Sequence, residues 1–298
     1  MIDIKLVRSN PDLIKNKIAL KGYDSEIVDK FLTSDKEYRR LLSEAEGLQS
    51  KRNKFAKNNT NTNIEEAKQL KLSLQKLEVE LNAREQESKQ LINSIPNLPL
   101  GNVPIGKTEN DNKVLKEWGN KPNFSFKPKT HFELGKALSL LDFESGSKVA
   151  GSQFYFLFGD AVLLEFALVE YVFKLLTKEG FIPVITPDLA KSKYYLGTGY
   201  IPKGDEAQIY TIEGQDLGLI ATAEITIAGL HADTVIPENN LPLKYIGYSH
   251  AFRQEAGSYG KYSHGLYRVH QFTKTEMFIF CTPEQSESMH EYLLSIEE

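Results

Sequence analysis

The chain has 298 residues, of which 41% are hydrophobic and 26% charged, with a formal net charge of -4. This composition is typical of a soluble globular protein and excludes the membrane and disordered classes. The start, MIDIKLVRSN, lacks an apolar signal core, and the single cysteine, Cys281, excludes an internal disulfide. We therefore expect a cytoplasmic protein. Because the six histidines are scattered, we expect no metal site built from protein ligands.

Two long segments near the N-terminus show the apolar spacing of paired helices. From about Ser25 to Lys57, seam residues recur at alternating steps of three and four, and a second such seam runs from Leu70 to Leu91. The stretch 58–63, rich in asparagine and threonine, favours a turn between them. The pattern predicts an antiparallel helical coiled-coil arm, about 50 Å long at about 1.5 Å per residue.

The cations of this arm concentrate towards its turn. Residues 51–60 contain no acid, and residues 1–100 carry 18 Lys and Arg against 15 Asp and Glu, whereas the other 198 residues carry 18 against 25. Such a hairpin alone is most often a dimerisation device or a spacer, but a basic tip suits a phosphate backbone better than an acidic protein surface. The cations that we expect at the phosphates are Lys51, Arg52, Lys54 and Lys57.

A linker separates the arm from a globular domain. Residues 93–130 contain five prolines with several glycines and asparagines, which is typical of a connecting segment. We divide the chain into an arm at 1–100, a linker at 101–130 and a core at 131–298. In the core, residues 160–179 predict a helix that is apolar almost all round and therefore buried, and residues 181–186 predict a strand that Pro187 ends.

A polar pair follows later in the core. Residues 217–224 predict a strand that runs into a helix at 225–231, and Thr222 and Glu224 lie at the junction. A Thr-x-Glu at this place is either an N-capping pair or part of a binding site. The sequence alone leaves both interpretations open.

The stretch Ser249–Phe280 carries the richest set of functional groups. It predicts two extended segments joined by a loop rich in Gly and Tyr. Because side chains alternate along a strand, Arg253 and Glu255 share a face of the first segment. The corresponding face of the second segment carries Arg268, His270, Phe272, Lys274 and Glu276.

This set differs from an ordinary surface hairpin. A single exposed ion pair stabilises by only about 0.2 to 1 kcal/mol and is common. Here two guanidinium groups suit phosphates, a flat ring suits a base, and carboxylates suit an ammonium or a hydroxyl. The pattern therefore predicts a site for a nucleotide together with an amino acid. We interpret His270 as a hydrogen-bonded strand histidine and not as a general base.

The same stretch resembles a known motif. The run Phe252–Glu255, then Ala256–Ser258, Gly265–Phe272 and Glu276 resembles motif 2 of class II aminoacyl-tRNA synthetases, and in its detail the seryl-tRNA synthetases. The helix at 160–179 with its following strand resembles motif 1, which builds a dimer interface in that class. The resemblance implies an α+β fold, with an N-terminal antiparallel helical coiled-coil arm followed by a class II antiparallel sheet core with helices. It also implies a homodimer.

The resemblance further implies a serine-tRNA ligase. Serine and ATP would give seryl-adenylate and pyrophosphate, with Mg2+ bound at the ATP phosphates, and the seryl group would then pass to tRNA(Ser). Arg253 and Arg268 are the implied catalytic residues. The implied serine ligands are Thr222, Ala223, Glu224, Glu276 and Arg253; the implied ATP ligands are Arg253, Gln254, Glu255, Arg268 and Phe272; and the implied tRNA contacts are Lys51, Arg52, Lys54 and Lys57.

Two departures from the family pattern bear on function. The motif 2 loop has Tyr262, Ser263 and His264 where the family usually has Asp-Thr-Arg or a similar run, and no glycine-rich third motif with an ATP-binding arginine occurs before Glu298. We therefore expect a C-terminally incomplete core, with motif 3 absent, that activates serine poorly by itself. The alternative function is a truncated, catalytically inactive relative that binds tRNA or serine.

Overall fold

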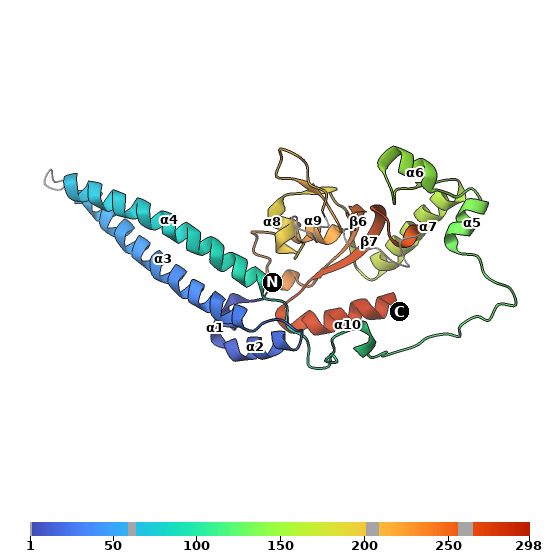
Figure 1. Ribbon diagram of the computed structural model, residues 1–298, viewed down its shortest axis with the longest axis horizontal. Helices are drawn as coiled ribbons and strands as arrows, with labels where there is room; N and C mark the ends of the chain where they lie inside the picture. Colours follow the sequence, from blue (N-terminus) through green and yellow to red (C-terminus); the bar gives the residue numbers. More distant parts are fainter. Residues whose placement is uncertain (1, 59–63, 201–208, 256–264) are drawn as a thin grey trace. The chain divides into compact units, whose positions relative to one another are not determined.

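The structure is a computed structural model that describes residues 2–58, 64–200, 209–255 and 265–298 (Figure 1). The chain forms two compact units, Met1–Lys121 and Pro122–Glu298, and the boundary falls inside the predicted linker. The departing loop residues at 262–264 lie outside the described residues. No helix in the part of the chain that the structure describes combines the length and the apolar character that crossing a membrane requires.

The first unit contains the predicted helical hairpin. Two short helices, α1 (Ile4–Ser9) and α2 (Pro11–Ala19), precede the long α3 (Glu26–Asn58) and α4 (Ile64–Ser94), which are 33 and 31 residues long. Pro11 occupies the first turn of α2, where its missing N–H is not needed. Figure 1 shows α3 and α4 lying side by side in opposite directions. The prediction of two paired helices of similar length is confirmed.

The base of the arm is the best packed part of the first unit. Next to its apolar core, Asp35 is only 2% exposed and accepts hydrogen bonds from Arg8 Nε at 2.9 Å, Arg8 Nη2 at 2.6 Å and Arg39 Nε at 3.0 Å. A carboxylate with this exposure needs such partners, since an unpaired buried charge is strongly destabilising. The buried members of the adjoining core are Val7, Ile14, Ile18, Val28, Phe31, Ile92 and Ile95.

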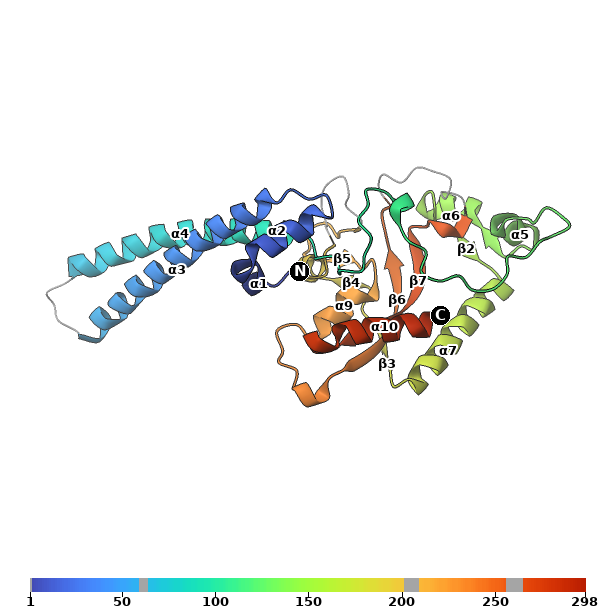
Figure 2. The ribbon, with the colours of Figure 1, turned by 90° about the horizontal axis from the view of Figure 1, so that it is seen from below.

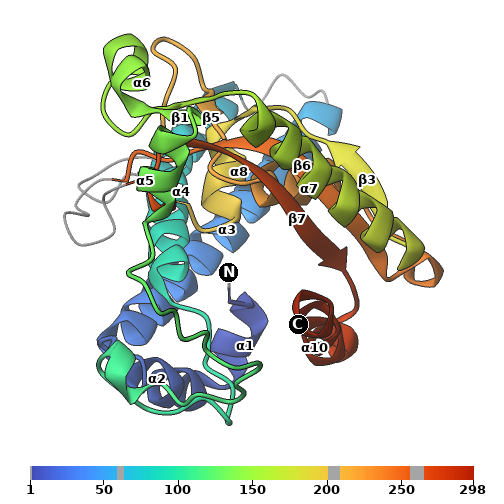
Figure 3. The same ribbon diagram turned by 90° about the vertical axis from the view of Figure 1, so that its right-hand side faces the viewer.

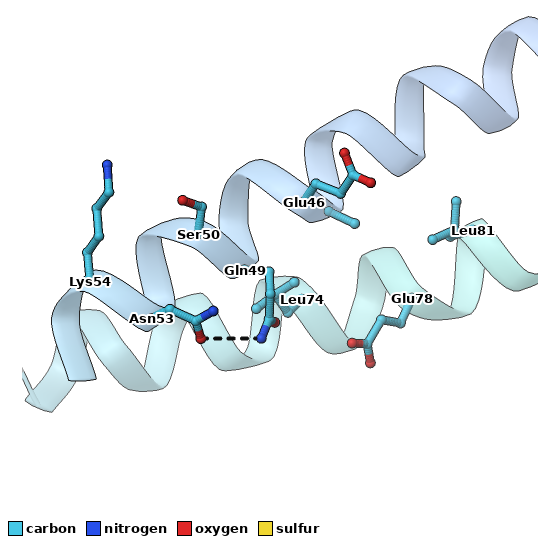
Figure 4. A pocket seen from close by; sticks show the side chains of 9 residues that line it. Glu46, Gln49, Ser50, Asn53, Lys54, Leu74, Glu78 and Leu81 are labelled. Atoms are coloured by element: carbon cyan, nitrogen blue, oxygen red, sulfur yellow. Dashed lines mark hydrogen bonds between the residues drawn. The ribbon is translucent and has the colours of Figure 1, made fainter. Parts of the chain in front are cut away.

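Packing between α3 and α4 weakens towards the tip. Leu41 and Leu74 are buried, but the predicted seam residue Arg52 is exposed and Phe55 is 39% exposed. A groove of about 700 Å³ opens between the two helices (Figure 4). Its lining residues are Ala45, Glu46, Gln49, Ser50, Asn53, Lys54, Leu74, Glu78 and Leu81. Small and polar side chains here occupy positions that large apolar residues fill in a tightly packed coiled coil.

The second unit is built on a three-stranded sheet in the order β3-β6-β7. β6 (Leu243–Phe252) and β7 (Gln271–Phe280) pair antiparallel over their full ten-residue lengths. β3 (Ile182–Ile185) pairs with β6 in the parallel direction, which the sequence pattern did not predict. The long hairpin predicted around Ser249–Phe280 is confirmed, and its first strand begins earlier, at Leu243.

Helices cover both faces of this sheet (Figures 2 and 3). On one face, α7 (Asp160–Lys178) and α10 (Ser286–Glu297) pack around the buried Ile246 of β6. On the other face, α9 (Ala223–Leu230) packs through Ala223 and Ile227 against Tyr245. The residues of β6 and β7 that face α9 therefore lie on the same side as the N-terminus of α9.

Short elements connect these parts. They are α5 (His131–Ala137), β1 (Leu141–Asp142), α6 (Phe143–Ala150), β2 (Phe156–Leu157), β4 (Leu189–Ala190), α8 (Ser192–Gly197), β5 (Gly218–Leu219), and the 3-10 turns η1 (Glu109–Asp111), η2 (Glu238–Asn240), η3 (Gly265–Tyr267) and η4 (Pro283–Gln285). The strand predicted at 217–224 is wrong in extent: β5 has two residues, because α9 begins at Ala223 with Thr222 as its cap.

The expectation that the helix at 160–179 is buried is wrong for a single chain. Leu176 is the buried residue of α7, whereas Leu164, Phe166, Leu168 and Tyr171 are 60%, 62%, 57% and 65% exposed. A helix that is apolar all round has one face for the sheet and a second face that needs another covering. The apolar pattern of the sequence does not distinguish a face that packs on the sheet of the same chain from a face that this sheet leaves exposed.

Candidate active site

The β6–β7 hairpin forms the floor of the candidate site. In register, Gly247 pairs with Glu276, Ser249 with Lys274 and Ala251 with Phe272. Three small residues of β6 thus lie opposite three large functional ones of β7, all on the face that α9 covers. The predicted alternation of Phe272, Lys274 and Glu276 along one strand face is confirmed.

The N-terminus of α9 reaches this floor. The Thr222 side chain caps the helix and accepts a weak hydrogen bond from the Glu224 N–H at 3.5 Å. The same Glu224 N–H donates to Glu276 Oε2 at 3.1 Å, and the Thr222 hydroxyl also donates to Glu276 Oε2. The two interpretations of the Thr-x-Glu pair are therefore compatible: it caps a helix and also gathers around a carboxylate of β7.

A glycine permits this close approach. A Cβ atom added to Gly247 would lie 2.7 Å from the Cβ of Ala223 and 2.5 Å from Cδ1 of Ile227. Any side chain at 247 would push α9 away from the strand that carries Glu276. Ala223 is itself fully buried against the sheet, so it offers its backbone and not its side chain to the site.

Lys274 contacts the groups of the candidate site, although the sequence reasoning did not name it as a ligand. Its Nζ donates to Thr222 Oγ1 at 2.5 Å and to Glu276 Oε1 at 2.9 Å. The side chains of Lys274 and Glu276 are only 27% and 22% exposed, so the pair is partly shielded from water. The alternation of side chains along β7 was a usable signal for Lys274, because it places Lys274 on the same strand face as Phe272 and Glu276, which were assigned to the site.

Arg253 lies just beyond the end of β6. Its N–H donates to His270 O at 2.9 Å, and His270 Nδ1 lies 2.9 Å from Arg253 O, so His270 is hydrogen-bonded as predicted. The predicted strand position of His270 is wrong, because β7 begins at Gln271. The Arg253 Nε donates to Ala221 O at 3.3 Å, and the guanidinium lies over the Phe272 ring with its Cζ 5.2 Å from the centroid. These contacts bring the cation to the aromatic end of the site.

The remaining predicted ligands follow Arg253 and precede β7. Arg268 Nε lies 3.2 Å from Glu255 Oε2 in an ion pair whose side chains are 38% and 24% exposed, and Gln254 is partly buried. Arg253 and Glu255 were expected to share a strand face, but β6 ends at Phe252 and Glu255 has a positive φ of 49°. The two-residue alternation therefore does not apply to them.

The charges at the α9 end of the site influence one another. Burial raises the pKa of the Glu224 carboxyl, and the neighbouring Glu276 raises it further, while Lys274 lowers it. Burial also raises the pKa of the Tyr200 phenol, with Glu224 and Glu276 adding to the shift and Arg253 opposing it. The electrostatic environment at this end of the site is therefore set by two acids, Glu224 and Glu276, and two cations, Lys274 and Arg253.

The predicted phosphate contacts lie in the first unit and are taken with that unit alone. Lys51, Arg52 and Lys54 are exposed along the last two turns of α3, and Lys57 belongs to the same helix. In Figure 4 the Lys54 side chain extends outward beside the groove. An exposed row of cations with no acid between them matches the predicted basic surface.

Comparison with known proteins identifies the family. Residues 1–99 match the seryl-tRNA synthetase N-terminal domain, and residues 209–298 match the tRNA synthetase class II core domain (G, H, P, S and T). The serine–tRNA ligase of Dictyoglomus turgidum is 48% identical over 307 residues, which cover 100% of this chain and 72% of that protein. The chain belongs to the seryl-tRNA synthetase family. The ligase of Rubrobacter xylanophilus is 44% identical with the same coverage.

Solved structures of the family share the fold. The seryl-tRNA synthetase of Pyrococcus horikoshii, complexed with ATP, superposes with a TM-score of 0.84 at 33% identity, covering 99% of this chain and 73% of that one. The cytoplasmic serine–tRNA ligase of Naegleria fowleri, in complex with AMP, gives a TM-score of 0.79 at 29% identity, covering 100% and 70%. The resemblance read from motif 2 and the α+β fold are confirmed.

Proposed function

We propose that this chain is a serine–tRNA ligase, which activates serine with ATP to seryl-adenylate and transfers the seryl group to tRNA(Ser). The names of the similar proteins support this function, and none of the comparisons favours the catalytically inactive alternative. The observation that carries the proposal is the cluster in which α9 and β7 bring Thr222, Glu224 and Glu276 together. In this proposal, residues 1–100 bind tRNA, residues 131–298 form the catalytic core, and residues 101–130 link the two.

The serine end of the site uses the acids of α9 and β7. A substrate ammonium needs acceptors, and Thr222, the Ala223 backbone and the Glu224 carboxylate provide them at the helix N-terminus. Glu276 would accept from the serine hydroxyl. A site built to hydrogen-bond a substrate hydroxyl rejects the analogue that lacks it, because its own polar groups would remain unpaired.

The nucleotide end uses the groups around Arg253. We propose that Phe272 stacks on adenine, that Glu255 and Gln254 contact its polar edge, and that Arg268 binds the outer phosphates. For this, the ion pair between Arg268 and Glu255 exchanges its partner when ATP binds. Arg253 then lies between the α-phosphate and the serine carboxylate, where it offsets the charge that both bring.

The chemistry follows from this placement. A serine carboxylate is ionised at neutral pH and is already a nucleophile, so the site needs orientation and charge stabilisation and no strong base. Arg253 and Arg268 are the proposed catalytic residues. No three His, Cys, Asp or Glu side chains converge among the described residues, so we propose that Mg2+ enters with the ATP phosphates and neutralises them there.

The remaining parts of the proposal concern assembly. The exposed cations Lys51, Arg52 and Lys54, with Lys57, would contact the tRNA backbone. The apolar outer face of α7 would pack against a second copy of the chain, giving a homodimer. The Naegleria fowleri relative is described as cytoplasmic, and we propose the same compartment here.

Replacement of Glu276 by glutamine tests the proposed function. Glu276→Gln removes the charge that accepts from serine, so we expect serine affinity to fall about 30- to 1,000-fold, the typical effect of truncating a partly buried charge pair. ATP affinity should change little. The measurements are calorimetric titrations of L-serine and ATP, and serine-dependent pyrophosphate exchange.

Glu284→Gln is the matched control, because Glu284 is exposed in the turn after β7. It should leave both ligands unaffected. A native chain that binds neither serine nor ATP, or a Glu276→Gln chain that binds serine like the native one, would contradict the assignment.

A further inference from the structure

Lys274 holds the polar groups of the serine end in place. Its ammonium donates to Thr222 Oγ1 at 2.5 Å and to Glu276 Oε1 at 2.9 Å. An ammonium group has donors only, so the Thr222 oxygen must accept from it. The Thr222 hydroxyl hydrogen is therefore directed elsewhere, to Glu276 Oε2. A single cation thus sets the direction of one hydroxyl and one carboxylate.

The same cation balances the charge of the site. Glu224 from α9 and Glu276 from β7 are two acids in one partly buried volume: burial raises the pKa of Glu224, Glu276 raises it further, and Lys274 lowers it. The other charged or titratable groups that act there are Arg253 after β6 and Tyr200 after α8. Arg253 lies over Phe272 and bonds Ala221 O, at the nucleotide end. Lys274 is the described cation that directly contacts Glu276.

On the basis of the proposed function, we propose that Lys274 is a positioning residue of the amino-acid pocket. Its ammonium fixes the Thr222 hydroxyl and the Glu276 carboxylate and lowers the pKa of the Glu224 carboxyl, so that the pocket can accept a substrate ammonium. Without Lys274, the Glu224 carboxyl would hold its proton more tightly and the substrate ammonium would lose an acceptor.

The variant Lys274→Met tests this role by its pH profile. L-serine and its amine-free analogue β-hydroxypropionate are titrated into the 298-residue chain by calorimetry or NMR between about pH 5 and about pH 8, on the side to which the Glu224 pKa is raised above its ordinary range. We expect Lys274→Met to bind serine about 10- to 100-fold more weakly, the usual cost of a lost hydrogen bond to a charged group. The loss should be larger at the lower pH, where the Glu224 carboxyl holds its proton.

Two further results should accompany this loss. The preference for serine over β-hydroxypropionate should shrink in Lys274→Met, because the ammonium is the group that loses its acceptor. Lys274→Arg, which keeps the charge, should keep the pH profile of the native chain. ATP affinity and the unfolding temperature show whether the fold is intact, and if Lys274→Met does not fold, Lys274→Gln carries the same pH test.

Lys244→Met is the matched control. Lys244 lies on the same sheet, on the face away from α9, and its Nζ donates to Glu179 O at 2.5 Å. Its removal should leave serine binding and its pH profile unchanged.

Several outcomes would overturn the inference. Tighter serine binding by Lys274→Met would mean that Lys274 competes with the substrate ammonium. An equal loss at every pH and for both ligands would mean that Lys274 has a merely structural role. A native chain that binds serine while Lys274→Met binds it equally well would overturn this inference alone, whereas a native chain that does not bind serine would overturn the proposed function as well.

Discussion

In the proposed function, Glu224 serves substrate binding at the expense of the stability of the fold. Burial raises the pKa of its carboxyl, Glu276 adds to the shift, and Lys274 opposes it. A carboxyl that holds its proton more tightly in the folded chain than in the unfolded chain lowers the free energy of unfolding as pH rises between the two pKa values. The ionised form of Glu224, which we propose binds the substrate ammonium, is therefore the form that makes the fold less stable.

Replacement of Glu224 by glutamine should accordingly stabilise the chain while it weakens serine binding. We expect the unfolding temperature of Glu224→Gln to exceed that of the native chain at about pH 7.5 and to approach it at about pH 5, nearer the ordinary range of the carboxyl. Differential scanning calorimetry at both pH values measures the difference. Glu238→Gln, at an exposed position of η2, is the control. A Glu224→Gln chain that is less stable at both pH values would contradict the prediction.

At the same scale, the sequence predicted the strand face but not the cluster. Alternation alone placed Phe272, Lys274 and Glu276 on one side of β7. The contact of Glu276 with Thr222, 54 positions away in the chain, depends on the close packing of α9 against Gly247. No local pattern encodes that approach, and the roles of these residues were available only from the resemblance to a known motif.

At the scale of elements, the arm is an unevenly packed pair of helices. Its base has a buried core and a fully paired Asp35, whereas the groove has leucines on the α4 side but only small and polar residues such as Ala45 and Gln49 near its middle on the α3 side. Heptad spacing predicted the pairing because it depends on local periodicity. It did not predict where the packing weakens, because the same spacing accommodates alanine, glutamine and leucine alike.

Filling this groove should stabilise the arm. We expect Ala45→Leu to raise the free energy of unfolding by about 1 to 2 kcal/mol, because part of a leucine side chain is removed from water between α3 and α4. Amide hydrogen exchange in residues 45–53 and 74–81 should slow, and chemical denaturation gives the free energy. Ala83→Leu makes the same change at an exposed site of α4 and should leave exchange in these segments unchanged. Equal effects of the two variants would show that helix propensity, and not packing, is responsible.

The cations of the arm should determine its affinity for tRNA. Replacing Lys51, Arg52 and Lys54 together by alanine removes three potential phosphate contacts. We therefore expect the slope of log affinity against log salt to decrease in magnitude by about 2 to 3. Filter binding or fluorescence anisotropy with tRNA(Ser) at several salt concentrations measures it.

The control removes the same number of cations from the second unit. Lys127, Lys129 and Lys178 are exposed, and their replacement by alanine should leave the slope unchanged. If both triple variants reduce the slope equally, the arm binds RNA only through the net charge of the chain.

For the molecule as a whole, the outer face of α7 is the surface that we propose as the homodimer contact. Leu164 and Leu168 lie one turn apart and are 60% and 57% exposed in the single chain. We expect the double variant Leu164→Glu and Leu168→Glu to weaken the proposed homodimer by at least about 100-fold, because unpaired charges would be buried at the contact. Sedimentation velocity at several concentrations measures the dissociation.

Lys178→Glu changes the charge at an exposed position in the last turn of the same helix and serves as the control. A native chain that sediments as a monomer at all concentrations would contradict the proposal. The amino-acid pattern alone does not show whether α7 packs in the core of one chain or at a contact between two chains, because apolar residues fill both kinds of position.

The buried carboxylate of Asp35 also favours one register of α3 in the helical hairpin. Along a seam of repeating heptads, a slip of α3 by one repeat would preserve much of the apolar matching but would carry the tip about 10 Å along the helix axis. The salt bridge from Arg8 of α1 to Asp35 exists in one alignment only, whereas Arg39 lies on α3 itself and would move with Asp35. After a slip, the Asp35 carboxylate would lose the hydrogen bonds from Arg8 and keep the one from Arg39. The ion pair with Arg8 at the base of the arm thus favours one position of the tip, and with it, in the proposed function, one length of arm that is offered to tRNA.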